Sequence, residues 1–232
     1  MKKLNYTLLA AALAASTLLV SNQTQAQGIL KITEVQSSEA AETTFTNSQD
    51  WFELSNVGNA AVNVTGYTMD DNSDLFSKSV VLMGITSIAA GESVVFFETT
   101  GTSPTLTAAD FQAWWGSSLS PALQIGTYSG SGVGLSSSSD QVNIFTSTGT
   151  PVDGVLFNTA TTGYSFVFDT GAAGRLPTGL SQLGVNGAFA SVNGDVGSPG
   201  VIAAVPEPST LALAGISLAA LAGLRRSQNR KA

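Results

Sequence analysis

Short segments in which apolar and polar residues alternate recur through the middle of the chain, and they limit the fold more than any other feature. A period of two places every second side chain on the same face, which predicts β-strands with one buried face. Residues 93–97 are apolar on both faces and predict a central strand. Because these segments are short and separated by turn residues, we expect an all-β sandwich. The alternating apolar pairs are Leu30 and Ile32, Phe52 and Leu54, Val62 and Val64, and Val142 and Ile144.

One short helix is predicted in the long segment after residue 97. Thr107 is suited to cap its first turn, Asp110 lies three residues later, and Gly116 can end it. The sequence therefore predicts a helix of about two turns inside a long insertion.

Three tryptophans allow two interpretations. Trp114 and Trp115 lie in the predicted helix, and Trp51 begins an expected strand. The favoured interpretation is that they pack in the core. The alternative is an exposed aromatic patch on which sugar rings stack, which is typical of a carbohydrate-binding module.

The N-terminal residues fit a secretory signal. Two lysines at positions 2 and 3 precede a largely apolar run of 13 residues, 8–20, and a polar stretch. The apolar run is too short to span a bilayer of about 30 Å comfortably. Thr24 and Ala26 are small enough for the −3 and −1 positions, so we expect signal peptidase to remove residues 1–26 before Gln27. The alternative is a retained N-terminal anchor.

The C-terminus has three parts of its own. Two prolines cannot continue a strand ladder or enter a helix interior, so they separate the folded region from the apolar segment after them. Residues 211–224 are small and apolar, and the basic tail behind them favours the cytoplasmic side of a membrane. The residues of the motif and of the arginine pair are Val205, Pro206, Glu207, Pro208, Arg225 and Arg226.

This order, at the very end of the chain, resembles the PEP-CTERM sorting signal. The resemblance implies that residues 205–232 anchor transiently in the inner membrane through a short transmembrane helix. It also implies recognition by an exosortase-like enzyme, cleavage near the motif, and release or re-anchoring outside the cell. Members of this family usually come from Gram-negative bacteria that make exopolysaccharide. The alternative is a plain anchor that is never processed.

The 178 residues between the two signals, 27–204, are enough for one domain. This segment has three basic and fifteen acidic residues, a net charge of −12 that argues against binding of nucleic acid or anionic lipid. The chain has no cysteine, which excludes disulfides, and no histidine, which removes the commonest general base and zinc ligand.

Several segments between residues 28 and 200 also resemble a lamin tail domain, in the order found in that family. The resemblance implies an immunoglobulin-like β-sandwich. The segments are 32–35, 50–56, 62–67, 69–70, 88–92, 139–144, 152–157 and 197–200.

A calcium site is one interpretation of an acidic turn. Asp70, Asp71, Asn72 and Asp74 concentrate oxygen ligands, and we expect Asp50 to lie near them. The spacing resembles the start of an EF-hand loop, but its glycine and its bidentate glutamate are missing. The alternative is a solvated acidic turn with no cofactor.

Catalysis has little support in the sequence. Residues 130–134 are glycine-rich but lack both the dinucleotide fingerprint and the P-loop lysine. Glu34 and Glu53 could form the carboxylate pair of a glycoside hydrolase, but two nearby carboxylates carry little information in so acidic a chain.

We therefore expect a non-enzymatic exported protein of the cell envelope or extracellular matrix, with the sandwich as an interaction module. Its expected partners are signal peptidase, an exosortase-like enzyme, and exopolysaccharide or another matrix protein. The alternatives are a carbohydrate-binding module of an exopolysaccharide matrix and a secreted hydrolase.

Overall fold

The computed structural model describes residues 26–45, 49–99 and 106–202. Thr24, the sorting motif, the arginine pair and both apolar terminal segments lie outside these residues. Within the described part of the chain, no helix is long and apolar enough to cross a membrane.

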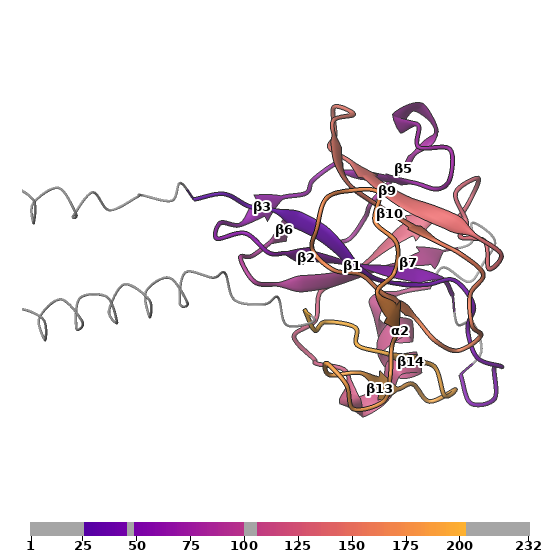
Figure 1. Ribbon diagram of the computed structural model, residues 1–232. Coiled ribbons are helices and arrows are strands. Elements are labelled where there is room, and N and C mark those ends of the chain that lie inside the picture. The colour runs from indigo at the N-terminus through magenta and orange to yellow at the C-terminus, as the bar shows by residue number, and fades with distance from the viewer. Residues whose placement is uncertain (1–25, 46–48, 100–105, 203–232) are drawn as a thin grey trace, which may run out of the picture.

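Two β-sheets form the body of the protein (Figure 1). The larger has six strands in the order β12-β11-β1-β2-β7-β8, and the smaller has four in the order β10-β9-β4-β5. Neighbouring strands are antiparallel except for the parallel pair of β7 and β8. The six strands are β1 (Leu30–Gln36), β2 (Trp51–Asn56), β7 (Ser93–Thr99), β8 (Ile125–Ser129), β11 (Phe166–Val167) and β12 (Gly179–Leu180). The four are β4 (Thr68–Asp70), β5 (Val80–Val81), β9 (Asp140–Phe145) and β10 (Pro151–Phe157).

The remaining elements are short. Two two-stranded ladders pair β3 (Val62–Asn63) with β6 (Ser87–Ile88) and β13 (Phe189–Ala190) with β14 (Val196–Gly197). The helices are η2 (Phe76–Lys78), α2 (Ala108–Trp115) and η3 (Gly116–Ser118). The expected all-β sandwich with one short helix in a long insertion is confirmed.

The two sheets enclose the larger hydrophobic core. Alternate residues of facing strands fill it, among them Ile32, Phe52, Phe96 and Ile144, all at most 1% exposed. Phe52 and Phe96 stack across neighbouring strands with ring centroids 5.6 Å apart. Ile32, Phe52 and Ile144 come from the segments with period-two alternation, so the pattern correctly placed one face of their strands.

A second core lies on the other side of the six-stranded sheet, where α2 packs (Figure 1). Trp51 contacts Phe111 and Trp115 edge to face, at centroid distances of 5.9 and 5.5 Å. The helix begins as expected, because the backbone N–H of Thr107 donates to the Asp110 carboxylate at 2.7 Å.

The expectation of a single buried face is wrong for β1 and β2. All residues of β2, and all but one of β1, are buried. The reason is that α2 and the segment around β14 cover the face that the alternation left polar. Polar side chains such as Glu34 and Glu53 are therefore interior groups.

One buried carboxylate joins the two sheets. Asp153 of β10 accepts hydrogen bonds from the Ile32 N–H of β1 at 2.8 Å, from Lys31 Nζ at 3.2 Å and from Arg175 Nη1 at 2.8 Å. Arg175 also donates to the Ile32 carbonyl, which fixes the guanidinium against β1. Two of the three basic residues of the domain thus neutralise a single buried acid.

Replacing Arg175 by alanine should lower the free energy of unfolding by about 3 kcal/mol, because Asp153 keeps Lys31 as its only ionic partner while staying buried. Urea denaturation measures this change. The matched control is Lys78→Ala, since Lys78 is exposed, and it should change stability by less than about 0.5 kcal/mol. Equal effects of the two substitutions would show that the cross-sheet cluster does not stabilise the fold.

Candidate functional site

The two candidate catalytic carboxylates meet on neighbouring strands. Glu34 and Glu53 are register partners in β1 and β2, and they are 1% and 0% exposed. Burial raises the pKa of Glu53 to about 8, and the neighbouring Glu34 adds to the rise. Burial also raises the pKa of Glu34, against the opposing effect of its hydrogen bonds to serines. At neutral pH this pair therefore tends to hold a proton.

Both carboxylates are occupied by hydrogen bonds from late segments of the chain. Glu34 accepts bonds from the hydroxyls of Ser165, Ser181 and Ser198, and from the Ser198 N–H at 2.8 Å. Glu53 accepts the Gly200 N–H at 2.6 Å and the Thr33 hydroxyl at 2.6 Å. These bonds make the pair an anchor for the closing segment, 197–200.

Gly197 allows the closing segment to approach this closely. A Cβ at this position would lie 2.8 Å from the Trp115 ring and 2.9 Å from Glu34 Oε1. Any larger residue would therefore push the segment away from the carboxylates that hold it.

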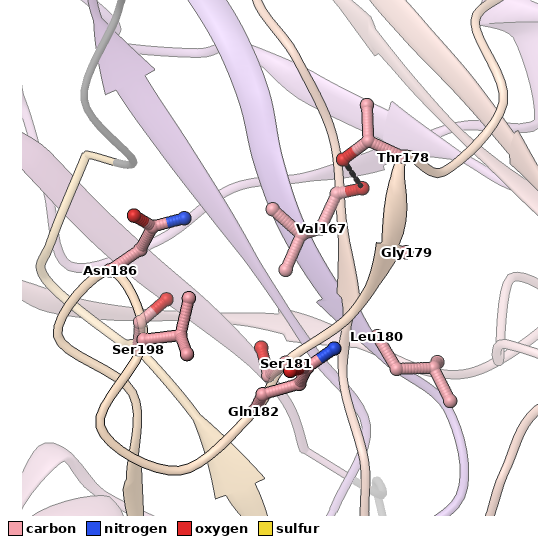
Figure 2. A pocket seen from close by; sticks show the side chains of 9 residues that line it. Val167, Thr178, Gly179, Leu180, Ser181, Gln182, Asn186 and Ser198 are labelled. Atoms are coloured by element: carbon pink, nitrogen blue, oxygen red, sulfur yellow. Dashed lines mark hydrogen bonds between the residues drawn. The ribbon is translucent and has the colours of Figure 1, made fainter.

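A small pocket of about 200 Å³ opens beside this anchor. Figure 2 shows Ser181 and Ser198 at its wall, with Asn186 and Val167 from separate segments around them. Thr178 donates to the Val167 carbonyl across its edge at 3.1 Å. Glu34 and Glu53 do not line this pocket. A glycoside hydrolase needs its two carboxyl groups on either side of a substrate in a cleft, and this burial leaves no room for one.

Asp195 is a further anchor, which sequence reasoning did not identify. It is fully buried and accepts hydrogen bonds from Trp114 Nε1 at 2.8 Å, from Gln36 Nε2 at 2.8 Å and from the Ala40 N–H at 2.6 Å. It thereby ties α2 to β1 and to the loop after β1. No spacing or motif marked this aspartate, because these partners lie 81 to 159 residues away along the chain.

The three tryptophans are interior residues. Trp51, Trp114 and Trp115 are 0%, 1% and 1% exposed. A sugar ring cannot stack on an indole face that is already covered, so the interpretation of these residues as glycan contacts is wrong for this structure. The physical reason is the second core, in which Trp115 contacts both other indoles and all three contact Phe111.

Asp50 lies with other acids instead of with the acidic turn. It precedes β2, and its electrostatic neighbours are Glu39 and Glu98. Burial, with Glu39 next, raises the pKa of Asp50 to about 9. The hydroxyl of Tyr128 is buried nearby without a hydrogen-bond partner among the described residues, and burial raises its pKa well above the usual value.

Hydrogen bonds from nearby residues to its own carboxylates stabilise the acidic turn, 70–74. Asp70 accepts hydrogen bonds from the Ser73 hydroxyl at 2.6 Å and the Leu75 N–H at 2.7 Å, and Asp71 accepts the Ser73 N–H at 3.2 Å. In the described part of the chain, no group of three or more acidic side chains is arranged to hold a metal ion. Calcium binding by Asp70, Asp71, Asn72 and Asp74 therefore stays a prediction, and Asp50 has other neighbours.

Two family models match the chain. One, described as Lamin Tail Domain, matches residues 23–159, which is more than half of the chain. The other, described as a PEP-CTERM protein-sorting motif, matches residues 204–227 and supports export to the cell envelope or the extracellular space. Signals of this kind are processed by exosortase-like enzymes, and both families are non-catalytic. A search of curated proteins finds no match.

Both resemblances seen in the sequence are thus confirmed. The lamin-tail match stops at residue 159, although the sandwich continues. Strands β11 and β12 extend the six-stranded sheet, and Ser198 and Gly200 bind the carboxylates of β1 and β2. The segment from β11 to Gly200 therefore completes the domain without matching the family model.

Because burial raises the pKa of Glu53, we expect the domain to lose stability as the pH rises. The unfolded chain releases the Glu53 proton near pH 4.5 and the folded one near pH 8, so the folded state holds more protons between these values and stability falls across that window. One such proton contributes a slope of about −1.4 kcal/mol per pH unit. Glu53→Gln should flatten the slope, as measured by urea denaturation from pH 5 to pH 8.

The matched control for that experiment is Asp74→Asn, which neutralises an exposed carboxyl and should keep the slope of the parent protein. A glutamine variant with an unchanged slope would contradict the assignment of a raised pKa to Glu53.

Proposed function

Because the chain belongs to the lamin tail domain family, we propose that its sandwich is a non-enzymatic interaction module, brought to the cell envelope or extracellular matrix by the C-terminal sorting signal. The observation that carries this proposal is the position of the signal. The closing segment ends with Gly200 bound to Glu53, and the sorting-motif match begins at residue 204. Few residues separate the anchored end of the domain from the segment that a processing enzyme would cut.

The N-terminal boundary supports the same arrangement. Gln27 is the first residue of the predicted mature chain, and its N–H donates to Asn59 Oδ1 at 2.6 Å while its carbonyl accepts the Asn59 N–H at 2.9 Å. A cut before Gln27 would leave these bonds to the folded domain intact. The proposed division is a signal peptide 1–26, a domain 27–204 and a sorting signal 205–232.

The interior chemistry supports a binding role over a catalytic one. Glu34, Glu53, Asp153 and Asp195 are buried, and each accepts hydrogen bonds that connect distant segments. Such carboxylates hold the module together, which leaves its surface as the place for partners. The hydrolase alternative has no observation in its favour.

We propose that export and processing of the protein take three steps. Signal peptidase removes the N-terminal segment, residues 211–224 anchor the chain transiently in the inner membrane, and an exosortase-like enzyme cuts near the motif. The mature domain then meets exopolysaccharide or another matrix protein.

Replacing Pro206, Glu207 and Pro208 together by alanine should leave the tail attached and retain the protein in the membrane fraction of the producing cells. Immunoblots of cell fractions measure both the length and the location of the chain. The control replaces Gln228 and Asn229, which come after the end of the sorting-motif match, and it should be processed normally. Normal processing of the triple variant would refute the sorting proposal.

A further inference from the structure

A groove runs over the outer face of the four-stranded sheet, on the side away from both hydrophobic cores. Its main hollow has a volume of about 480 Å³ and lies over β9 and β10. A second hollow of about 240 Å³ shares Gln141 and Leu156 with the first, so the two adjoin along the same strands. The larger volume is within the range of about 300–1,000 Å³ that is usual for ligand-binding sites.

Two chain segments form the walls of this groove. On one side is the acidic turn, with Asn72 and Asp74 at the hollows. On the other side, residues 173–176 are fastened to the edge of β10. The Gly174 N–H donates to the Gly154 carbonyl at 2.7 Å, and the Leu156 N–H donates to the Arg175 carbonyl at 3.0 Å. The walls therefore belong to ordered, hydrogen-bonded structure.

The floor of the groove has an aliphatic part. It includes Gly154 and Leu156 of β10, and Leu176 borders the second hollow with 59% of its surface exposed. A Cβ on Gly154 would lie 2.6 Å from Asn143 Oδ1. The Asn143 side chain can therefore lie over β10 only because residue 154 has no side chain.

An aromatic pair marks one end of the groove. Phe145 lines the main hollow, and the ring of Phe76 lies 6.0 Å from it, centroid to centroid. Phe76 is 40% exposed, so the apolar surface continues past the strand end.

Side-chain amides supply the polar groups of the groove. Asn143 Nδ2 donates to the Asp71 carbonyl at 2.8 Å and to Gln141 Oε1 at 3.3 Å. The Gln141 Nε2 group, and the side-chain amides of Asn72 and Asn158, make no hydrogen bond to any other described residue. An amide both donates and accepts, so these groups can bind a ligand whose own groups do both.

The charged residues that line the groove limit the kinds of ligand that it can bind. No described residue that lines the two hollows is basic, whereas Asp74 and Asp140 line them. The charge of Asp153 is already matched by Lys31 and Arg175. A phosphate or a uronic acid would be repelled by Asp74 and Asp140, and no basic side chain lines the two hollows to offset that repulsion.

We propose that this groove binds an uncharged segment of a polysaccharide, with hydroxyls on the amides and C–H faces on the aliphatic floor. The proposal rests on the proposed function, because it assigns the partner of the exported module and the surface that binds it. It replaces the three tryptophans as the glycan contacts, since their rings are buried.

The test uses the mature protein purified from the producing cells. Their extracellular polysaccharide is separated by anion exchange into neutral and acidic fractions, and each is cast into native gels to measure retardation of the protein. The neutral fraction should retard the protein and the acidic fraction should not. The double variant Gln141→Ala, Asn158→Ala should raise the dissociation constant about tenfold, because it removes two hydrogen-bonding groups.

The matched control is the double variant Gln112→Ala, Gln182→Ala, which removes two exposed amides outside the groove and should bind like the parent. Thermal unfolding of both variants checks that the fold is kept. Equal retardation of the two variants, binding of the acidic fraction alone, or binding of neither fraction would each overturn the groove proposal. If sorting is normal in such a case, the export proposal still stands; if the sorting test fails, that proposal falls whatever the groove binds.

Discussion

The fold depends on how two buried glutamates are satisfied. Glu34 and Glu53 lie opposite each other on β1 and β2, on the face away from the inter-sheet core, and their hydrogen-bond donors among the described residues are all uncharged. A buried carboxyl without partners would cost several kcal/mol. Serine and threonine hydroxyls and the N–H groups of Ser198 and Gly200 remove most of that cost. The closing segment is therefore part of the interior, and the sheet depends on it.

The same solution recurs elsewhere, because the domain has many acids and few bases. Asp195 is satisfied by an indole, an amide, a hydroxyl and a backbone N–H. Asp153 differs, since it binds both Lys31 and Arg175. Hydrogen bonding to neutral groups lets an acidic chain bury carboxylates without matching each to a cation. Burial disfavours the charged form and raises the pKa of Asp50 and Glu53, so a bound proton neutralises these carboxyls where no cation does.

This arrangement also separates the roles of interior and surface. The glutamate pair was the candidate for catalysis and the tryptophans were the candidates for glycan binding, but all of these side chains are buried and stabilise the fold. The outer face of β9 and β10 carries side-chain amides and aliphatic side chains, and the Gln141 Nε2 group there makes no hydrogen bond to another described residue.

Elements that depend on local periodicity and capping could be predicted from the residues themselves. Period-two alternation predicted β1, β2 and β9, the apolar run at 93–97 predicted a central strand, and Thr107 with Asp110 and Gly116 predicted α2. The C-terminal sorting signal could also be recognised, because a short ordered motif acts without tertiary context.

Which polar residues became interior depended on tertiary packing. Whether Glu53 faces water or a closing segment depends on a contact 147 residues away, and Trp114 donates its indole N–H to an aspartate 81 residues away. Alternation reports the two faces of a strand, and only packing against other layers determines whether the second face is buried.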